Sequence, residues 1–392
     1  MKKLIRVTTV PISLSKLLSG QLSNFKEYFE IIAVSSPGNI LNKVESEAKV
    51  RTFSLNLTRA ITPLKDIISL IKFTFFLIKE KPLIVHSHTP KAGIVSMMAA
   101  FLARVPIRMH TVAGLPLTEA KGFKKRVLVF VEKLTYATAT NVYPNSFGLK
   151  DYILQNKLCS ERKLKVIGSG SSNGIDTDYF SVVNMNSDVL KGLKESIGIE
   201  KNTFVFCFVG RIVKDKGIHE LVSAFNRIDQ KEFKSKLLLV GNYEQDLDPI
   251  DNEILHKIKA NKNIIEAGYQ EDVRPYLAIS NALVFPSYRE GFPNVVLQAG
   301  AMNLPAIVSN INGCNEIITH LENGLIVPVK EVTPLYESMI LLIKKPSLCN
   351  SLSLNSRERI KSKYERAHFW NLLLEEYKLL ESNVYNTKGF IR

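Results

Sequence analysis

Two doubly wound α/β domains in tandem are predicted from three features of the sequence. Short apolar runs alternate with amphipathic stretches along the whole chain, which is typical of parallel sheets covered by helices. The rhythm starts again at Thr203–Val209, after the small-residue stretch 169–176 and a polar segment over 184–201. The 392 residues also exceed what a single hydrophobic core usually covers. We therefore expect one domain over residues 1–185 and a second over residues 200–365.

The first domain is expected to contain five parallel strands. Each is a short apolar run bounded by polar residues or turn formers, and helices fill the gaps between them. The predicted strands are Ile5–Val10, Ile31–Ser35, Leu83–His88, Ile107–Thr111 and Thr140–Tyr143, and the predicted helices include Pro63–Lys79 and Phe123–Ala137.

The second domain repeats this pattern and is followed by an amphipathic C-terminal segment. Apolar residues at helical spacing over Lys363–Glu381 predict a helix, and we expect residues 366–385 to pack back on the first domain. The second-domain elements are the strands Thr203–Val209, Lys236–Val240, Asn263–Ala267, Ala282–Phe285, Pro305–Val308 and Leu325–Val327, with a helix over Ile218–Ile228.

Leader and transmembrane segments are not expected. The stretch Leu4–Val10 is interrupted by Arg6 and lacks a cleavage-site pattern, so we interpret it as a buried strand. The longest apolar run, Ile67–Ile78, is shorter than the roughly 20 residues that span a bilayer, and it contains Lys72. Contact of the protein with a lipid surface stays open.

The cysteines predict neither a disulfide framework nor a zinc site. They have no paired spacing and no clustered histidines beside them. A reducing, cytoplasmic compartment fits this usage best, and no metal is expected. The four cysteines are Cys159, Cys207, Cys314 and Cys349.

Positive charge is concentrated in the first half of the chain. Up to Asp178 there are 26 Lys and Arg against 12 Asp and Glu, which leaves +14 of the total of +15. Such a field attracts phosphates, nucleic acid or anionic lipid headgroups, or it serves only as a solvated basic face. Nucleic acid is disfavoured because the basic clusters, such as Lys121 with Lys124–Arg126, are short and lack interleaved aromatic residues.

Two cations follow the predicted strand that ends at Val209. Arg211 offers a planar fork and Lys216 a compact charge, so together they could neutralise a diphosphate at the entrance of the next helix without a metal. Ligands of open parallel sheets gather at these carboxyl ends of strands, where helix amino termini expose N–H groups. The alternative is a helix-entry loop with exposed cations.

The turn Glu290–Pro293 is the second candidate element of this site. Gly291 indicates close backbone approach, and Pro293 indicates a helix start. A carboxylate here could bind a sugar hydroxyl, or it could simply be a helix-start charge favoured by the dipole. Farther along the same helical face, Gln298 could reach ribose hydroxyls or be a solvated residue. The backbone amides that would face a bound anion are those of Gly291, Phe292 and Asn294.

Three histidines and one glycine complete the residues singled out. His86 and His88 close one predicted strand and His110 closes another, which indicates a cleft in the basic domain; satisfied core imidazoles are the alternative. Their spacing forms no metal site with any carboxylate that can be placed. Gly20 ends the loop after the first strand and could permit backbone approach to phosphate. Because no Gly-x-Gly-x-x-Gly fingerprint exists, a nicotinamide or flavin cofactor is disfavoured.

As a set, these motifs resemble retaining glycosyltransferases of family 4 over roughly Val7–Tyr364. The resemblance implies the GT-B architecture, in which two Rossmann-like domains face a cleft. It also implies a donor on the carboxy-terminal domain, an acceptor on the amino-terminal domain, and no cofactor or metal. The motifs are Gly210-Arg211 with Lys216-Gly217, Val240-Gly241, Gly268 with Asp272, Pro286-Ser287 with Glu290–Pro293, and Asn173–Asp176 with Phe180.

The resemblance further implies roles for individual residues. Arg211 and Lys216 would hold the donor diphosphate, Glu290 would touch the transferred sugar, and His110 matches a histidine near the reacting sugar. The family's usual second glutamate is Gln298 here, which keeps a carbonyl acceptor but loses the charge. Expected donor-binding residues are Gly210, Arg211, Lys216, Gly241, Glu290, Gly291, Phe292, Asn294 and Gln298. Expected acceptor-binding residues are Gly20, His88 and His110, and expected catalytic residues are His110, Glu290, Arg211 and Lys216.

Two segments point to a substrate class. His86–Gly93 and Thr111–Pro116 are similar to bacterial enzymes that extend polyprenyl-diphosphate-linked oligosaccharides for capsule or O-antigen. This similarity implies transfer of a hexosyl or N-acetylhexosaminyl group from a UDP-sugar to a lipid-linked saccharide. A basic first domain would be drawn to an anionic membrane, so we expect a cytoplasmic protein associated peripherally with the inner face of the plasma membrane. Residues that could hold lipid chains, or alternatively belong to the core, are Phe73, Phe75, Phe76, Phe123 and Leu128.

Two other functions stay open. A non-catalytic scaffold that binds sugar nucleotides or lipid is compatible with Gln298. A UDP-N-acetylglucosamine 2-epimerase would share the architecture, but such an enzyme usually needs further acidic residues and histidines that cannot be assigned here.

Overall fold

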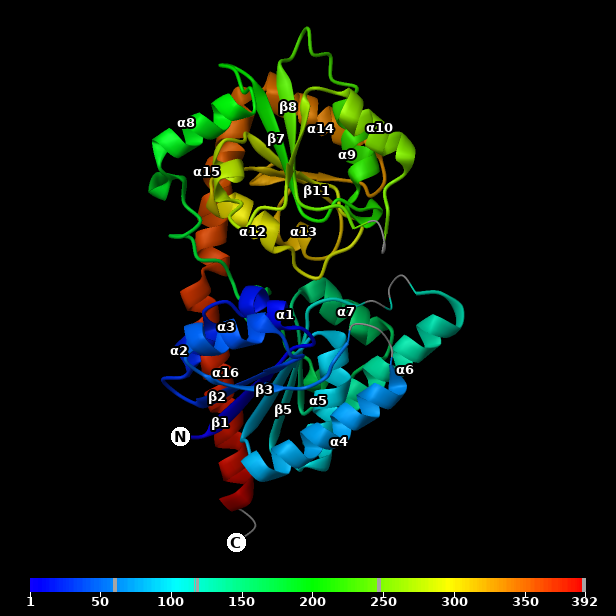
Figure 1. The fold of residues 1–392 in the computed structure, drawn as a ribbon, viewed down its shortest axis with the longest axis vertical. Helices are drawn as coiled ribbons and strands as arrows, with labels where there is room; N and C mark the ends of the chain where they lie inside the picture. Colours follow the sequence, from blue (N-terminus) through cyan, green and yellow to red (C-terminus); the bar gives the residue numbers. More distant parts are fainter. Residues whose placement is uncertain (59–61, 116, 118–119, 245–247, 390–392) are drawn as a thin grey trace. The chain divides into compact units, whose positions relative to one another are not determined.

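Two six-stranded sheets, each entirely parallel, organise the chain in the computed structural model (Figure 1). The structure describes all residues except 59–61, 116, 118–119, 245–247 and 390–392, so Pro116 of the segment Thr111–Pro116 lies outside the described residues. The chain divides into two units. Unit 1 comprises Met1–Gly174 and the segment that starts at Ala367, and unit 2 comprises Ile175–Arg366.

The sheet of unit 1 has the strand order β3-β2-β1-β4-β5-β6. Successive strands are added to one side of β1 as far as β3 and to its other side from β4 onward, so the switch point, where ligands of such sheets bind, lies between β1 and β4. One strand, β3, was not expected, because its residues are exposed or half-buried and form no apolar run. The strands are β1 (Lys3–Val7), β2 (Glu30–Ser35), β3 (Arg51–Ser54), β4 (Ile84–His88), β5 (Ile107–Val112) and β6 (Asn141–Pro144).

Helices cover both faces of this sheet. Successive strand residues point to opposite faces, so Leu4 and Ile5 belong to different apolar clusters. On the side of Ile5 lie α4 (Pro63–Glu80), α5 (Pro90–Leu102), α6 (Gly122–Thr138) and α7 (Phe147–Gln155). On the side of Leu4 lie α1 (Pro11–Leu17), α2 (Gln21–Phe25), α3 (Asn39–Ala48) and α16 (Arg366–Gly389).

The C-terminal helix α16 packs on unit 1, as predicted (Figure 1). Phe369, Leu373 and Tyr377 are buried in one cluster with Leu4 of the sheet. The predicted helical segment is divided in the structure, because the backbone leaves the helical conformation at Glu365. The helix α15 (Pro346–Tyr364) ends before this residue, and α16 begins after it.

Unit 2 repeats the strand order around a second switch point, between β7 and β10. Its sheet has the order β12-β11-β10-β7-β8-β9, so the prediction of two doubly wound domains is confirmed. The strands are β7 (Phe204–Val209), β8 (Ser235–Val240), β9 (Ile264–Gly268), β10 (Ala282–Phe285), β11 (Ala306–Ser309) and β12 (Gly324–Val327). The helices besides α15 are α8 (Ser187–Ser196), α9 (Ile218–Phe225), α10 (Asn252–Ala260), α11 (Arg274–Ala278), α12 (Asn294–Ala301), α13 (Cys314–Ile317) and α14 (Val332–Lys344).

The chain leaves unit 1 after Gly174, eleven residues before the boundary expected from the sequence. The backbone N–H of Ile175 donates to Tyr364 O at 2.8 Å. Phe180 is buried in the core of unit 2, and Arg357 Nη1 donates to its carbonyl at 3.1 Å. These contacts assign residues 175–185 to unit 2, a feature that their polar composition does not indicate.

Candidate functional site

The switch point of unit 2 brings together residues that are distant in the sequence. Lys216 lies in the loop after β7, and Glu290 lies in the loop after β10, the strand that pairs with β7. Lys216 Nζ and Glu290 Oε1 form an ion pair, and only 14% and 16% of the two side chains are exposed. The Ser287 hydroxyl donates to the same carboxylate oxygen at 3.1 Å. A mostly buried cation and carboxylate therefore meet where ligands of parallel sheets bind.

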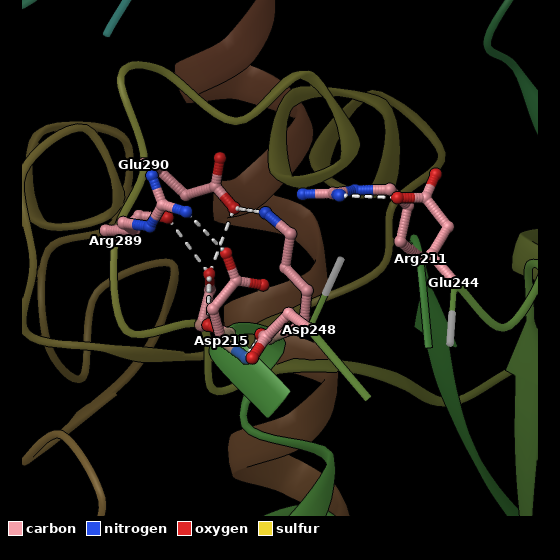
Figure 2. Close-up of polar contacts among 8 residues, drawn as sticks. Arg211, Asp215, Glu244, Asp248, Arg289 and Glu290 are labelled. Atoms are coloured by element: carbon pink, nitrogen blue, oxygen red, sulfur yellow. Dashed lines mark hydrogen bonds and ion pairs between the residues drawn. The ribbon is translucent and has the colours of Figure 1, made fainter. Parts of the chain in front are cut away.

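Arg211 has a carboxylate partner of its own beside this pair. Its Nη1 donates to Glu244 Oε2 at 2.8 Å (Figure 2). Burial lowers the pKa of Arg211, but the hydrogen bond and charge of Glu244 outweigh it and raise that pKa, with smaller contributions from Asp215 and Glu290. Arg211, Lys216 and Glu290, which are predicted to bind the donor diphosphate and sugar, thus lie within one electrostatic group, and both cations are matched by carboxylates.

A further set of polar residues ties the two loops together. Asp215, the neighbour of Lys216, accepts from Arg289 Nη2 at 2.9 Å (Figure 2). Its backbone N–H donates to Asp248 Oδ2 at 2.6 Å, and its carbonyl accepts from Tyr288 N–H at 2.8 Å. No sequence motif had indicated any of these supporting residues. Adjacency to Lys216 and Glu290 is the signal that would have pointed to Asp215 and Arg289.

Glycines permit the loops to approach one another. A Cβ added at Gly217 would lie 2.1 Å from Pro286 O, and one added at Gly241 would lie 1.8 Å from Gly210 O. Real Cβ atoms do not occupy such positions, and Gly217 also has a φ of +70°. The lack of a side chain at Gly241 therefore allows the end of β8 to meet Gly210 after β7. Their predicted contact with a donor stays a prediction.

The turn after β10 is held by an asparagine side chain. Asn312 Nδ2 donates to Glu290 O at 3.1 Å and to Gly291 O at 2.8 Å. Phe292 is buried and packs against Tyr364 with ring centroids 5.5 Å apart. The backbone that carries the Glu290 carboxylate is therefore fixed on both sides of the turn.

The helix α12 carries the two remaining predicted donor residues. It begins at Asn294, which is exposed, and Pro293 occupies the capping position. Gln298 lies about one turn further along and is half-buried. The helix start agrees with the sequence, and the contacts of the Asn294 backbone amide and the Gln298 side chain with a donor stay predictions.

The switch point of unit 1 buries the predicted histidines. His86 and His88 lie on β4 and His110 lies on β5, and none is more than 2% exposed. Burial lowers the pKa of all three imidazoles, that of His110 to about 4, so they are neutral at pH 7. His110 Nδ1 lies 2.9 Å from Ser87 Oγ, and a Cβ added at Gly93 would lie 2.5 Å from the His110 ring. A serine and a glycine thus define the position of His110.

A fully buried arginine connects His88 to the C-terminal helix. Arg6 Nη2 donates to Gln21 Oε1 at 2.6 Å and lies 2.9 Å from His88 Nε2. Its Nη1 donates to the Tyr377 hydroxyl at 3.0 Å, and that hydroxyl lies 2.7 Å from His86 Nδ1. Burial lowers the pKa of the Arg6 guanidinium. In the sequence Arg6 is only a break in an apolar run, and no local pattern indicates this network.

Gly20 packs against the same helix. Its φ is +79°, and an added Cβ would lie 2.6 Å from the Trp370 ring. Trp370 Nε1 in turn donates to Asn173 Oδ1 at 2.7 Å. Close packing of α16 thus explains why glycine is needed here, and a contact of Gly20 with an acceptor stays a prediction.

Two family models match the chain. Residues 31–170 match a glycosyl transferase 4-like domain, and residues 191–359 match the glycosyl transferases of group 1. The capsular polysaccharide biosynthesis glycosyltransferase CapM of Staphylococcus aureus is 34% identical over 377 residues, which cover 96% of this chain and 97% of the relative. The UDP-Gal:alpha-D-GlcNAc-diphosphoundecaprenol alpha-1,3-galactosyltransferase of Escherichia coli is 28% identical over 91% of this chain and 92% of the relative.

Solved structures share the fold over the whole chain. The crystal structure of Anabaena Alr3699/HepE in complex with UDP matches with a TM-score of 0.80 at 17% identity, over 96% of this chain and 100% of that chain. A glycosyltransferase from Rickettsia africae also matches with a TM-score of 0.80, at 18% identity, over 97% and 99% of the two chains. The likeness confirms the predicted GT-B fold class. Together with the two domain matches and the capsular relative, it shows that this chain belongs to the family 4 glycosyltransferases.

Proposed function

We propose that this glycosyltransferase moves a hexosyl or N-acetylhexosaminyl group from a UDP-sugar to a hydroxyl of a lipid-linked saccharide, with retention of the anomeric configuration. The observation that carries the proposal is the convergence of Arg211, Lys216 and Glu290 at the switch point of unit 2. The relatives add the substrate class, since one is named for a UDP-galactose donor and a diphosphoundecaprenol acceptor and another for capsular polysaccharide biosynthesis.

The proposed chemistry separates charge at the donor diphosphate. The bond between the anomeric carbon and the diphosphate oxygen breaks, and its electron pair stays on the leaving UDP. Arg211 and Lys216 stabilise that developing negative charge. The acceptor hydroxyl attacks the same face of the sugar and forms the new glycosidic bond, while its proton passes to the leaving diphosphate oxygen. The products are UDP and the extended saccharide.

Glu290 and His110 are proposed to orient the transferred sugar. The Glu290 carboxylate is held by Lys216 and by the Ser287 hydroxyl, so its position is defined before a donor binds. The neutral imidazole of His110 can exchange hydrogen bonds with sugar hydroxyls without placing a second positive charge beside an oxocarbenium-like centre. Gln298 is proposed to accept from ribose hydroxyls.

A lipid-linked acceptor would put the proposed reaction at a membrane surface. Across the described residues, every helix is too short or too polar to cross a bilayer. The basic first half of the chain would be attracted to anionic lipid and to the diphosphate of the acceptor. We therefore propose a cytoplasmic enzyme associated peripherally with the inner face of the plasma membrane.

A product assay tests this function. The protein would be incubated with a panel of UDP- and GDP-sugars and a short-chain lipid-diphosphate saccharide, and UDP release and the product anomer would be followed by chromatography and NMR. An α-linked product from an α-linked UDP-sugar is expected. Tight UDP binding with neither transfer nor donor hydrolysis would favour the scaffold, and an altered sugar formed without acceptor would favour the epimerase.

A further inference from the structure

The helix α4 is apolar on its outward side as well as on its buried side. Phe73 and Leu77 of its inner side lie in the core of unit 1. On the opposite side, large apolar side chains are exposed by between 49% and 79%. We call these residues the outer stripe of α4: Leu64, Ile67, Ile68, Ile71, Phe75 and Ile78.

The outer stripe is continuous along the helix. Its members follow one another at intervals of one, three or four residues, which places them on one face of an α-helix. Single exposed apolar residues are normal on a protein surface, but a contiguous row of leucine, isoleucine and phenylalanine marks an interaction surface. In the described part of unit 2, by contrast, large exposed apolar residues such as Val183, Tyr269 and Leu354 are scattered over separate elements.

The charges around the outer stripe are positive. Both acidic residues of α4 are engaged by basic residues elsewhere in unit 1: Asp66 by Lys91, and Glu80 by Lys3 and Arg51. The lysines of α4 are all exposed, and they are Lys65, Lys72 and Lys79.

The helix α6 also exposes large apolar side chains and lysines. The helix α5 packs against both α4 and α6, so the three helices form one layer on the sheet (Figure 1). Phe123 and Phe130 of α6 are 80% and 66% exposed. Exposed cations lie at the start of the same helix: Lys121, Lys124, Lys125 and Arg126. Of the five residues proposed from the sequence to hold lipid chains, Phe73 is core, Phe76 and Leu128 are partly buried, and Phe75 and Phe123 are exposed.

The outer stripe begins at the carboxyl edge of the sheet, where the predicted acceptor residues lie. Asp66 in the first turn of α4 pairs with Lys91 in the first turn of α5. Lys91 follows His88 at the end of β4 by three residues. A surface contacted by Leu64 and its neighbours would thus lie close to the end of unit 1 that is proposed to receive the saccharide.

We propose that the outer stripe of α4, together with the basic start of α6, docks unit 1 on an anionic lipid bilayer. This inference rests on the proposed function for its biological setting, and it names the surface that the function leaves unspecified. Aliphatic and aromatic side chains flanked by lysines are the composition of helices that lie in a membrane interface. A second copy of this chain fits less well, because two such basic faces would repel each other.

Vesicle binding tests the docking surface on the full chain. Sedimentation would compare vesicles of phosphatidylglycerol and phosphatidylcholine with vesicles of phosphatidylcholine alone. The wild-type protein should prefer the anionic vesicles, and I68S/F75S should lower its partition coefficient by about tenfold or more. The matched control is V183S/L354S, which removes two comparably exposed apolar residues from unit 2 and should bind as the wild type does. K124Q/K125Q should weaken binding mainly at low salt.

Three outcomes would overturn the proposal. They are equal vesicle binding by I68S/F75S and the wild type, wild-type indifference to anionic vesicles, and loss of self-association in I68S/F75S with vesicle binding unchanged. Circular dichroism would establish that each variant is folded. Transfer to a short-chain acceptor in solution should be unchanged in I68S/F75S. Absence of transfer in the wild type would refute the proposed function while vesicle binding still tests the docking surface.

Discussion

The two units share a strand order but use their switch points differently. In unit 2 the charged side chains lie on loops after the strands, where Lys216 pairs with Glu290 and Arg211 pairs with Glu244. In unit 1 the cation is Arg6, which lies within β1, has no exposed surface and contacts amide, hydroxyl and imidazole groups.

The difference shows how one topology supplies two kinds of polar site. A carboxylate that pairs with a loop cation can be replaced by a phosphate, because the charge of the cation stays balanced. A buried arginine whose partners are neutral cannot be displaced without leaving several buried polar groups without hydrogen-bond partners. The loop cations of unit 2 can therefore exchange a carboxylate partner for a phosphate. The buried polar residues of unit 1 instead fix α16 against the sheet.

Removing a loop cation should give the largest effect and test whether the charge of unit 2 is functional. Lys216→Ala or Arg211→Ala should lower kcat/KM for transfer by a factor on the order of 10² to 10³, because stabilisation of the leaving diphosphate is lost. The fold should persist, as judged by circular dichroism. Lys214→Ala, which removes an exposed cation from the same loop, serves as the control. Turnover close to wild type in both variants would remove these residues from the proposed role.

Acid should destabilise the protein through unit 1. The folded-state pKa of His110 is lowered to about 4 by burial, below its ordinary value of 6.5. The unfolded chain then binds more protons, so the free energy of unfolding falls as the pH drops from about 6.5 through about 4, by an amount on the order of 3 kcal/mol for this residue. Urea unfolding at several pH values measures the slope, and His110→Gln should reduce it. An identical slope in both proteins would contradict the assignment.

Tyr377→Phe should weaken the buried hydrogen-bond network that joins Arg6 and His86 to α16. The change removes the hydroxyl that accepts from Arg6 and contacts His86, and it should lower the free energy of unfolding by about 1–3 kcal/mol. Tyr385→Phe alters an exposed ring on the same helix and should have almost no effect. Because the proposed donor residues lie in unit 2, UDP affinity should stay the same. A change in UDP affinity without a change in stability would contradict the assignment of a structural role to the polar network of unit 1.

The smallest expected effect is on UDP affinity, when Glu244, the carboxylate partner of Arg211, loses its charge. Glu244→Gln removes the partner of Arg211 and should tighten UDP binding by at most about fivefold, because exposed ion pairs contribute roughly 0–1 kcal/mol. Isothermal titration calorimetry measures the Kd. Glu253→Gln, which disrupts another exposed pair of unit 2, is the control. Weaker UDP binding in Glu244→Gln would mean that Glu244 supports Arg211 rather than competing for it.

Most of the fold could be predicted because its signals are local. Apolar strands, amphipathic helices and turn residues recur in an order that only parallel α/β sheets accommodate. The strand β3 was not predicted, because Arg51–Ser54 lies at an exposed sheet edge and forms no apolar run. The candidate donor residues could be named because strand ends are ligand sites in such sheets, so Arg211 and Glu290 stood out before their partners were known.

Other residues could not be interpreted from the sequence because their partners are distant. Arg6 resembles an interruption of a strand until Tyr377, 371 residues later, is seen to accept its hydrogen bond. The run Ile67–Ile78 places apolar residues on every side of a helix, so periodicity does not show that Phe73 is covered and Phe75 is exposed.

By itself, then, the sequence determined the two-sheet architecture and the positions of cations and carboxylates at strand ends, since both follow from patterns within a few residues. Only the tertiary structure decided which carboxylate pairs with which cation. It also decided which polar groups are buried against α16 and which face of α4 is exposed to solvent. Those choices depend on contacts between segments that are far apart along the chain, and local periodicity carries no information about them.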